Sequence, residues 1–160
     1  MTEKTSTVNM VTFSDNKAVI RRFIEAYNNR NLQVFDELVA PDYVDHTHQQ
    51  KGREEFKRLF TLAFEGFPDW HESIQDIISE GENVWVRVRA MGTHSGMWTL
   101  FGVALPPTGN KVVMDMVFMF RVVAGKLVEG GEVDDQVDFF KQLGLIEYTE
   151  KGKKLFSQAQ

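Results

Sequence analysis

The chain has 160 residues, 42% hydrophobic and 26% charged, with a formal net charge of -5, which is the composition of a single soluble globular domain. The acidic balance and the lack of a basic run argue against nucleic acid as a partner. The absence of cysteine excludes disulfides and thiolate chemistry, and no apolar run approaches the roughly 20 residues that span a bilayer.

The chain begins with a polar stretch. Residues 1–13 carry only scattered apolar side chains and are predicted to form a flexible arm. A basic segment followed by an apolar stretch is missing there, so no signal peptide is expected. We therefore expect a cytoplasmic protein that does not interact with membranes.

Apolar residues recur at helical spacing in three segments of the N-terminal half. The first helix follows residue 13 and carries Val19, Ile20, Phe23, Ile24 and Tyr27. The second is a short helix over residues 32–39 that ends before Pro41, and an irregular segment is expected over residues 40–48. The third begins after Gly52 and is stopped by Pro68.

From Trp70 onward the apolar pattern has a period of two, which is typical of strands. Strands are predicted over residues 70–79, 84–91 and 111–123, and a further strand holds Glu132 after a turn at residues 124–126. Residues 92–109 are predicted to be looser. A final helix is predicted over residues 136–143, closed by Gly144, and residues 146–160 form a tail.

Helices followed by antiparallel strands indicate an α+β fold, with one domain over residues 14–145. The simplest packing curls the sheet around the helices into a cone whose interior is a natural ligand site. The chain is also rich in large, soft side chains, with 13 Phe, 7 Met, 3 Trp and 3 Tyr. This richness favours a roomy apolar pocket, and a well-filled core is the alternative.

Glu132 is the first candidate for a catalytic residue. By strand alternation it shares a face with Val128 and Gly130, with no cationic residue near it in sequence. If that face lines the interior, burial raises the pKa of the carboxyl group and suits it to proton transfer. The alternative is a solvated carboxylate at the rim of the sheet.

Asp134 and His94 are further candidates. Asp134 has the same parity as Glu132, and two neighbouring carboxyl groups can divide the roles of acid and base. Either Asp134 or Asp135 can instead cap the last helix. His94 ends a strand and either orients a substrate or Glu132, or bonds a loop backbone.

Several short motifs, in this order, resemble the SnoaL-like polyketide cyclase family within the NTF2-like group. The motifs lie at residues 40–44, 52–54, 92–96, 106–109, 125–129 and 142–144. The resemblance implies a cone-shaped α+β barrel, oligomerisation through the outer face of the sheet, and no metal or organic cofactor. It also implies that an acidic residue on the last strand catalyses an intramolecular aldol closure of a polyketide ester, and that residue falls on Glu132.

The sequence departs from the family pattern in two ways. Glu132 stands where the cyclases have Asp, which keeps the chemistry and moves the carboxylate outward by about one methylene. Met116 and Phe118 stand where the cyclases have Gln and His facing the same pocket. The site is therefore expected to be more apolar than in a polyketide cyclase.

Other residues are predicted to line the cavity or to form an interface. Asp45, His46 and His48 permit a metal site by type, but no metal is expected because the resembling family uses none. Trp85, Arg87, Arg89 and Met91 lie on the other sheet face and predict a homodimer or higher homo-oligomer. The predicted substrate-binding residues are Tyr27, Tyr43, His46, Phe60, Phe64, Met114, Met116 and Phe118.

Two functions are compatible with these observations. The first is a cofactor-independent cyclase or isomerase in which Glu132 acts as general acid and base on a small hydrophobic carbonyl compound. The second is a binding module that holds an apolar ligand in the cone, or a dimerisation scaffold, without turnover. The fold hosts both functions and does not decide between them.

Overall fold

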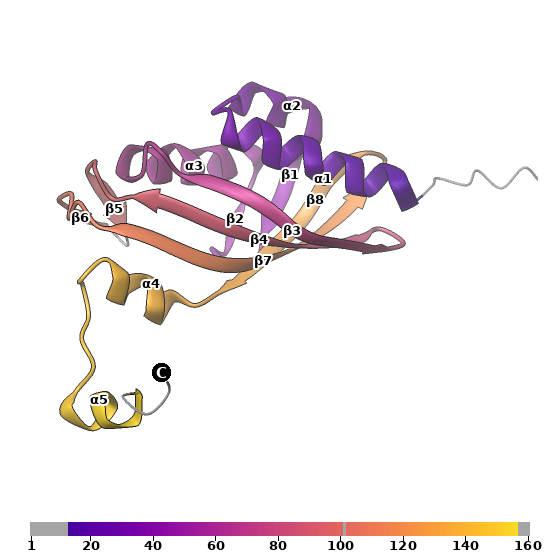
Figure 1. Ribbon diagram of the computed structural model, residues 1–160. Helices are drawn as coiled ribbons and strands as arrows, with labels where there is room; N and C mark the ends of the chain where they lie inside the picture. Colours follow the sequence, from indigo (N-terminus) through magenta and orange to yellow (C-terminus); the bar gives the residue numbers. More distant parts are fainter. Residues whose placement is uncertain (1–12, 101, 157–160) are drawn as a thin grey trace, which may run out of the picture.

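The computed structural model describes residues 13–100 and 102–156, so nearly all of the predicted N-terminal arm lies outside the described residues. Its helices are α1 (Phe13–Asn28), the 3-10 turn η1 (Leu32–Val34), α2 (Phe35–Leu38), α3 (Arg53–Gly66), α4 (Gln136–Gln142) and α5 (Glu150–Phe156). Its strands are β1 (Val39–Asp45), β2 (Gln50–Lys51), β3 (His71–Glu80), β4 (Asn83–Thr93), β5 (Trp98–Leu100), β6 (Val103–Leu105), β7 (Lys111–Val123) and β8 (Lys126–Asp134). Figure 1 shows them in sequence colours.

Six strands form one curved sheet in the order β2-β1-β8-β7-β4-β3, and β5 and β6 form a separate hairpin. Only β1 and β8 pair in parallel, so the sheet is mixed and mostly antiparallel. The α+β class is thereby confirmed. The tight turn between β7 and β8 places Ala124 at φ 48° and Gly125 at φ 77°, a left-handed pair that closes a two-residue hairpin.

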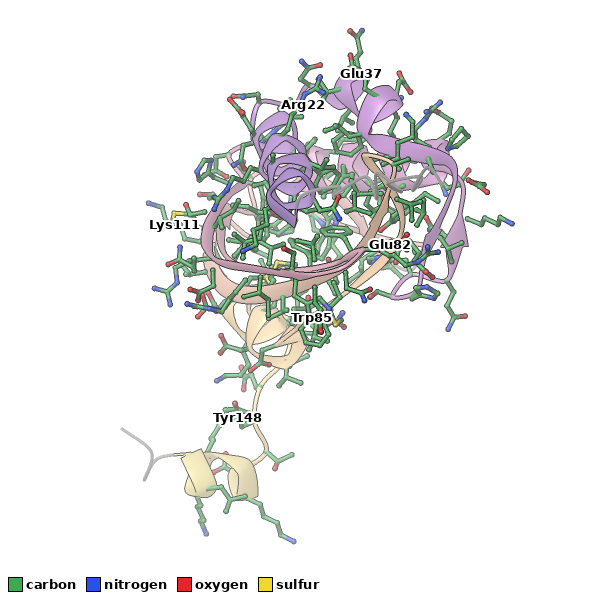
Figure 2. All side chains as sticks on the ribbon, turned by 90° about the vertical axis from the view of Figure 1, so that its right-hand side faces the viewer. Arg22, Glu37, Glu82, Trp85, Lys111 and Tyr148 are labelled. Atoms are coloured by element: carbon green, nitrogen blue, oxygen red, sulfur yellow. The ribbon has the colours of Figure 1, made fainter. Side chains whose placement is uncertain are left out.

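The concave face of the sheet is covered by α1, α2 and α3, and it holds the core (Figures 1 and 2). The apolar residues of α1 that define its helical spacing, Ile20, Phe23 and Ile24, are all buried. Phe23 packs against Phe35 of α2 and Phe120 of β7, with ring centroids 4.7 and 5.5 Å apart. The helices are thus fixed on the sheet by aromatic contacts.

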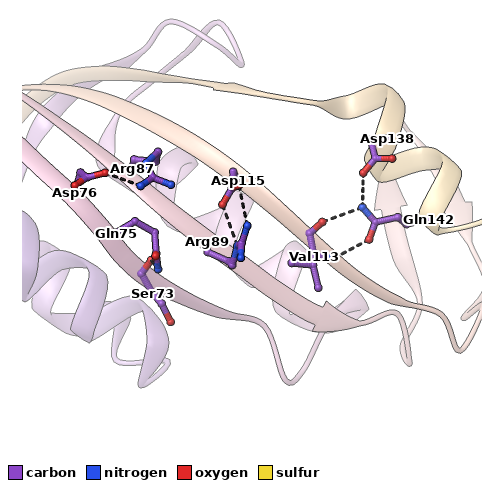
Figure 3. A network of polar contacts seen from close by, with 9 residues as sticks. All are labelled: Ser73, Gln75, Asp76, Arg87, Arg89, Val113, Asp115, Asp138 and Gln142. Carbon is purple, nitrogen blue, oxygen red and sulfur yellow. Dashed lines mark hydrogen bonds and ion pairs between the residues drawn. The ribbon is translucent and has the colours of Figure 1, made fainter. Parts of the chain in front are cut away.

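The convex face of the sheet carries ion pairs between neighbouring strands (Figure 3). Arg87 of β4 bonds Asp76 of β3, with Nη2 and Oδ2 2.6 Å apart, and Arg89 bonds Asp115 of β7 through two contacts of 3.1 Å. Along β4 these pairs lie between Trp85 and Met91, and the exposed apolar side chains of the same face are Ile78, Trp85, Met91, Val113 and Val133. Figure 2 shows Trp85 on the side of the sheet opposite to the helices.

The side chain of Gln142 on α4 completes the edge of β7 where β8 no longer pairs with it. Its Oε1 accepts the N–H of Val113 at 2.7 Å, and its Nε2 donates to the Val113 carbonyl at 2.8 Å (Figure 3). Nε2 also donates to Asp138 at 2.6 Å. One amide group thus takes the place of a strand and fixes α4 against the sheet.

Three parts of the predicted secondary structure were wrong. Residues 39–45 form β1 and not a helix end followed by an irregular segment, and Pro41 is tolerated because the β1–β8 register is interrupted between Val39 and Val44. The loose stretch over residues 92–109 contains the β5–β6 hairpin. The tail after residue 145 contains α5, and Figure 1 shows this segment extending away from the sheet.

Candidate functional site

Glu132 lies on the interior face of the sheet, opposite Phe118 of β7. Its side chain is 20% exposed. Burial raises the pKa of the carboxyl group to about 7; the charge of His48 opposes this shift, and Asp134 and Asp45 add to it. Within the described residues no Lys or Arg forms an ion pair with Glu132. The carboxyl group is therefore able to exchange a proton near neutral pH.

The predicted neighbours of Glu132 on its own strand need one correction. Arg121 pairs with Glu129 and Val122 pairs with Leu127, so Val128 is an extra residue in a β-bulge. The bulge shifts the alternation, and the fully buried Leu127, not Val128, shares the interior face with Gly130 and Glu132. The sequence alone does not reveal the bulge. Leu127 and Val128 are adjacent and both apolar, so the spacing does not show which of them faces the interior.

Gly130 makes room for aromatic rings beside Glu132. A Cβ atom on Gly130 would lie 2.5 Å from the Tyr43 hydroxyl oxygen and 2.6 Å from the Phe120 ring. Tyr43 is buried, and burial followed by the charges of Asp45 and Glu132 raises its pKa. Its hydroxyl group is therefore protonated and lies beside the strand that carries Glu132.

The turn after β1 supplies a histidine partner for Glu132. His48 Nε2 lies 3.9 Å from Glu132 Oε1, and His48 Nδ1 lies 2.9 Å from the buried Asp45 carboxylate. Asp45 also accepts the backbone N–H groups of Thr47 and His48 at 2.9 and 3.0 Å. Thr47 in turn bonds the backbone of Glu132, accepting its N–H at 2.7 Å. The turn is thereby tied to both Asp45 and β8.

The pKa values of Asp45 and His48 are shifted by their mutual contact. Burial alone would raise the pKa of Asp45, but the hydrogen bonds from His48 and Thr47 bring it below its ordinary value. The bond to Asp45 raises the pKa of His48, assisted by the charges of Glu132 and Asp134. The arrangement is an Asp45–His48–Glu132 series with His48 between two carboxyl groups, and sequence reasoning had considered His48 only as a metal ligand.

The structure assigns Asp134 and Asp135 different positions. Asp135 caps α4 by accepting the N–H of Asp138 at 2.9 Å. Asp134 pairs with Met116 in the register of β7 and β8, on the same face as Glu132, and burial raises its pKa. Asp134 therefore stays beside the site, and the capping role belongs to its neighbour.

His46 lies apart from this group. Its side chain is 61% exposed, and its Nε2 lies 2.7 Å from Glu129 Oε2. Glu129 is also bonded to Arg121 of β7. Of the two histidines in the turn, the structure brings His48 and not His46 to Glu132.

His94 is fully buried at the far end of the sheet. Its Nδ1 accepts the backbone N–H of Thr108 at 3.3 Å, its ring stacks on Phe67 at 5.0 Å, and its Nε2 has no partner among the described residues. Thr93, the residue before His94, pairs with Lys111 of β7. Glu132 pairs with Phe118, seven residues further along the same strand. Seven strand residues span roughly 23 Å. His94 therefore does not orient Glu132 by contact.

A second interior carboxyl group, Glu72 on β3, was missed. It is 4% exposed, and burial raises its pKa to about 8; the Trp70 hydrogen bond opposes this shift and the charge of Glu132 adds to it. The signal was present in the sequence, because Glu72 alternates with Trp70 and Ile74 as Glu132 does with its own apolar neighbours. The same criterion that selected Glu132 would have selected Glu72.

The predicted lining residues are mainly core residues that surround these groups. Met114, Met116 and Phe118 are buried on the interior face of β7. Tyr27 of α1 contacts Phe60 and Phe64 of α3, with ring centroids 4.8 and 4.9 Å apart. The interior near Glu132 is therefore apolar on the sheet side and aromatic on the helix side.

Two hollows lie on the outer side of α1. The larger, about 340 Å³, lies between α1 and β3, and the smaller, about 210 Å³, lies beside η1. Glu132 lines neither of them. Within residues 13–100 and 102–156 no three His, Asp or Glu side chains are placed to hold a metal ion. None of the helices in the same ranges is long and apolar enough to cross a membrane.

Comparisons with known proteins agree with this architecture. The solved structure of AclR from Streptomyces galilaeus, named as a proposed hydroxylase, has a TM-score of 0.75 at 23% identity and covers 92% of this chain and 93% of its own. IdmH from Streptomyces antibioticus, named as a proposed polyketide cyclase, has a TM-score of 0.67 at 34% identity and covers 81% of this chain and 98% of its own.

Sequence comparison leads to the same group. The aklanonic acid methyl ester cyclase DauD of Streptomyces sp. (strain C5) is 26% identical over 133 residues, which are 79% of this chain and 80% of that protein. The cyclase of the same name from Streptomyces peucetius, DnrD, is also 26% identical, over 79% of this chain and 88% of its own. The family model of the SnoaL-like polyketide cyclases matches residues 17–143, and the chain belongs to this family.

Proposed function

We propose that the protein is a cofactor-independent ester cyclase or isomerase that acts on a hydrophobic polyketide-type carbonyl compound, with Glu132 as its general base. The observation that carries this proposal is the desolvated carboxyl group of Glu132, held in the interior without a Lys or Arg partner among the described residues. A base is most effective when its pKa lies near the working pH. The cyclase names of DauD and DnrD support the substrate class.

The proposed reaction is an intramolecular aldol closure. Glu132 takes a proton from the carbon next to a carbonyl group, and the C–H electron pair forms an enolate. The enolate carbon attacks a second carbonyl carbon of the same molecule, a C–C bond forms, and the attacked oxygen becomes negative. That oxygen then takes up a proton, so the product is an isomer of the substrate.

The exposed fractions of the side chains indicate the side from which a substrate approaches. Glu132 is 20% exposed and His48 is 39% exposed, so the carboxyl group is reached past the turn that carries His48. Met116 and Phe118, each 7% exposed, form the apolar wall behind it. A hydrophobic compound whose reactive carbonyl groups lie at one end fits this polarity.

The test is turnover of aklanonic acid methyl ester, the compound named for DauD and DnrD, by the wild-type protein and by Glu132→Gln. The substitution keeps the shape of the side chain and removes its basicity. We expect turnover to fall by about 10²–10⁴-fold. The control is Glu80→Gln, an exposed carboxyl group on β3, which should leave turnover unchanged. Equal rates for wild type and Glu132→Gln would refute the proposed role.

A binding function is the second candidate. Met116 and Phe118 provide no hydrogen-bond donor opposite Glu132, and an apolar wall of this kind favours retention of a ligand over turnover. Native mass spectrometry of the purified protein tests this candidate. A co-purifying apolar compound that is retained equally by Glu132→Gln and released unchanged would support the binding module.

A further inference from the structure

The ring of His48 is held in place beside Glu132 by contacts on both sides of the turn. Its Nδ1 lies 2.9 Å from Asp45 Oδ2, and the same carboxylate accepts the backbone N–H groups of Thr47 and His48. The Thr47 hydroxyl group accepts the N–H of Glu132 at 2.7 Å and lies 3.2 Å from its carbonyl oxygen. The turn that carries His48 is therefore fixed to the strand that carries the proposed base.

His48 and Glu132 face each other without a hydrogen bond between them. Nε2 of His48 and Oε1 of Glu132 are 3.9 Å apart, which is longer than a hydrogen bond. The two side chains are 39% and 20% exposed, so a compound in solution reaches both. In a carbonyl compound the oxygen and the neighbouring carbon that loses a proton lie about 2.4 Å apart. One such unit therefore fits with its oxygen at Nε2 and its carbon at Oε1.

The other side chains around Glu132 do not supply an accessible donor of this kind. Met116 and Phe118, on the wall behind it, have no proton to donate. The Tyr43 hydroxyl group lies beside Gly130, but Tyr43 is 1% exposed. The Thr47 hydroxyl group is occupied by the backbone of Glu132. His48 is thus the donor that a substrate meets at this carboxyl group.

His48 donates from Nε2 when its ring is positively charged, because Asp45 then takes the proton on Nδ1 and a second proton remains on Nε2. The bond to Asp45 raises the pKa of His48 and burial opposes this shift. The charges of Asp45 on β1 and of Glu132 and Asp134 on β8 raise it further. The donating form therefore persists to higher pH than in a free histidine, alongside ionised Glu132.

We propose that His48 is a second catalytic residue, which binds the carbonyl oxygen of the substrate while Glu132 removes a proton from the carbon next to that carbonyl group. This inference rests on the proposed function. The C–H electron pair forms a C=C bond, and the electron pair of the C=O double bond moves to the oxygen, where the Nε2–H of His48 stabilises the negative charge. When the C–C bond forms, this carbonyl group is restored and His48 keeps its proton. The attacked oxygen receives the proton held by Glu132, so both residues return to their starting state.

The first test needs no turnover. The probe is 2-naphthol, an apolar ring system whose single oxygen resembles that of an enolate, and its binding is measured by isothermal titration calorimetry. We expect wild type to bind it, and His48→Ala to bind it about 10-fold more weakly or less well still, because a charged hydrogen-bond donor is lost. The control is His71→Ala, an exposed histidine paired with Met91 on the outer face, which should bind as wild type does. Equal binding by wild type and His48→Ala, or no binding by wild type, would overturn the proposal.

The second test separates direct contact with the substrate from an effect on the pKa of Glu132. With the ester substrate, kcat is compared at the pH where the rise governed by Glu132 is complete. His48→Ala should remain about 10²-fold below wild type there, and His71→Ala should equal wild type. Added imidazole should restore part of the lost rate in His48→Ala, because the position of the missing ring is open to solvent. It should not restore Glu132→Gln, which lacks the base.

The outcomes distinguish this proposal from the proposed function. If Glu132→Gln is inactive and His48→Ala reaches the wild-type kcat at higher pH, His48 only shifts the pKa of Glu132, and the base remains while the contact with substrate fails. If Glu132→Gln turns over the ester as wild type does, the proposed function fails and the role of His48 fails with it.

Discussion

At the scale of single residues, the conformation of the turn after β1 determines which histidine lies beside Glu132. His46 and His48 are two positions apart, and strand alternation would place them on one face. The chain instead turns at residues 46–49, where Gln49 has φ 54°, and the two rings bond different carboxylates. The sequence analysis placed His46 at the cavity and considered His48 only as a metal ligand, because the positions of the two rings depend on a turn conformation that residue spacing does not show.

His48 is predicted to set the pKa of Glu132. The positive form of His48 favours the ionised form of Glu132 and lowers its pKa against the effect of burial. In His48→Gln this opposing charge is lost, so the Glu132 midpoint should rise above about 7 and the ascending limb of the pH–activity profile should move to higher pH. Carboxyl 13C NMR titration measures the shift directly.

The matched control for this prediction is His46→Gln. The ring of His46 is bonded to Glu129 on the solvent side and does not face Glu132. Its removal should leave the Glu132 midpoint in place. A lower midpoint in His48→Gln, or an equal shift in both variants, would show that His48 does not act on Glu132 as inferred.

At the scale of elements, predictions held where an apolar pattern ran without interruption and failed at bulges and at Pro41. The helical spacing of α1 and the alternation along β7 correctly identified buried residues such as Phe23 and Phe118. The bulge at Val128 and the broken register of β1 leave no mark in the spacing, because their geometry is set by pairing with another strand, β7 for Val128 and β8 for β1. Glu132 was therefore assigned to the interior face correctly, whereas Val128 was assigned to that face wrongly.

Gln142 offers a test at this scale. Its amide group bonds both the N–H and the carbonyl of Val113, at the point where β8 has left the edge of β7. In Gln142→Ala both backbone groups lose their partner, so the amide of Val113 should exchange with deuterium faster, by about 5–10-fold for a loss of roughly 1 kcal/mol. Hydrogen–deuterium exchange read by NMR measures this effect.

The control is Val137→Ala, an exposed apolar residue on the same short helix. This substitution should leave the exchange of Val113 unchanged, because Val137 makes no hydrogen bond to the sheet. Unaltered exchange in Gln142→Ala would mean that water satisfies the edge of β7 equally well and that Gln142 does not fix α4.

At the scale of the whole molecule, the order of helices and strands was sufficient to predict the α+β class and a curved sheet with helices on one face. The positions of interior polar groups were harder to predict. Glu72 and Glu132 are 60 residues apart, on strands that do not pair, and only the curvature of the sheet brings their charges within range of one another. Curvature of this kind depends on long-range packing and not on local spacing.

The outer face of the sheet leads to the last prediction, that two copies of the chain associate through it. Ile78, Trp85 and Val133 are 63%, 51% and 62% exposed on this face, beside the ion pairs of Arg87 and Arg89. Trp85 and Ile78 are register partners on β4 and β3, and exposed apolar groups beside charged residues are typical of protein interfaces.

Sedimentation velocity should therefore give about twice the 18.4 kDa of one chain. In Trp85→Glu the mass should fall to that of a monomer, because a charge is placed beside Ile78 in the apolar part of this face. The circular dichroism spectrum should stay unchanged. Leu155→Glu, on the exposed helix α5, should leave the dimer intact. Dissociation by Leu155→Glu and not by Trp85→Glu would assign the interface to the C-terminal helix, and a wild-type monomer would rule out association through either surface.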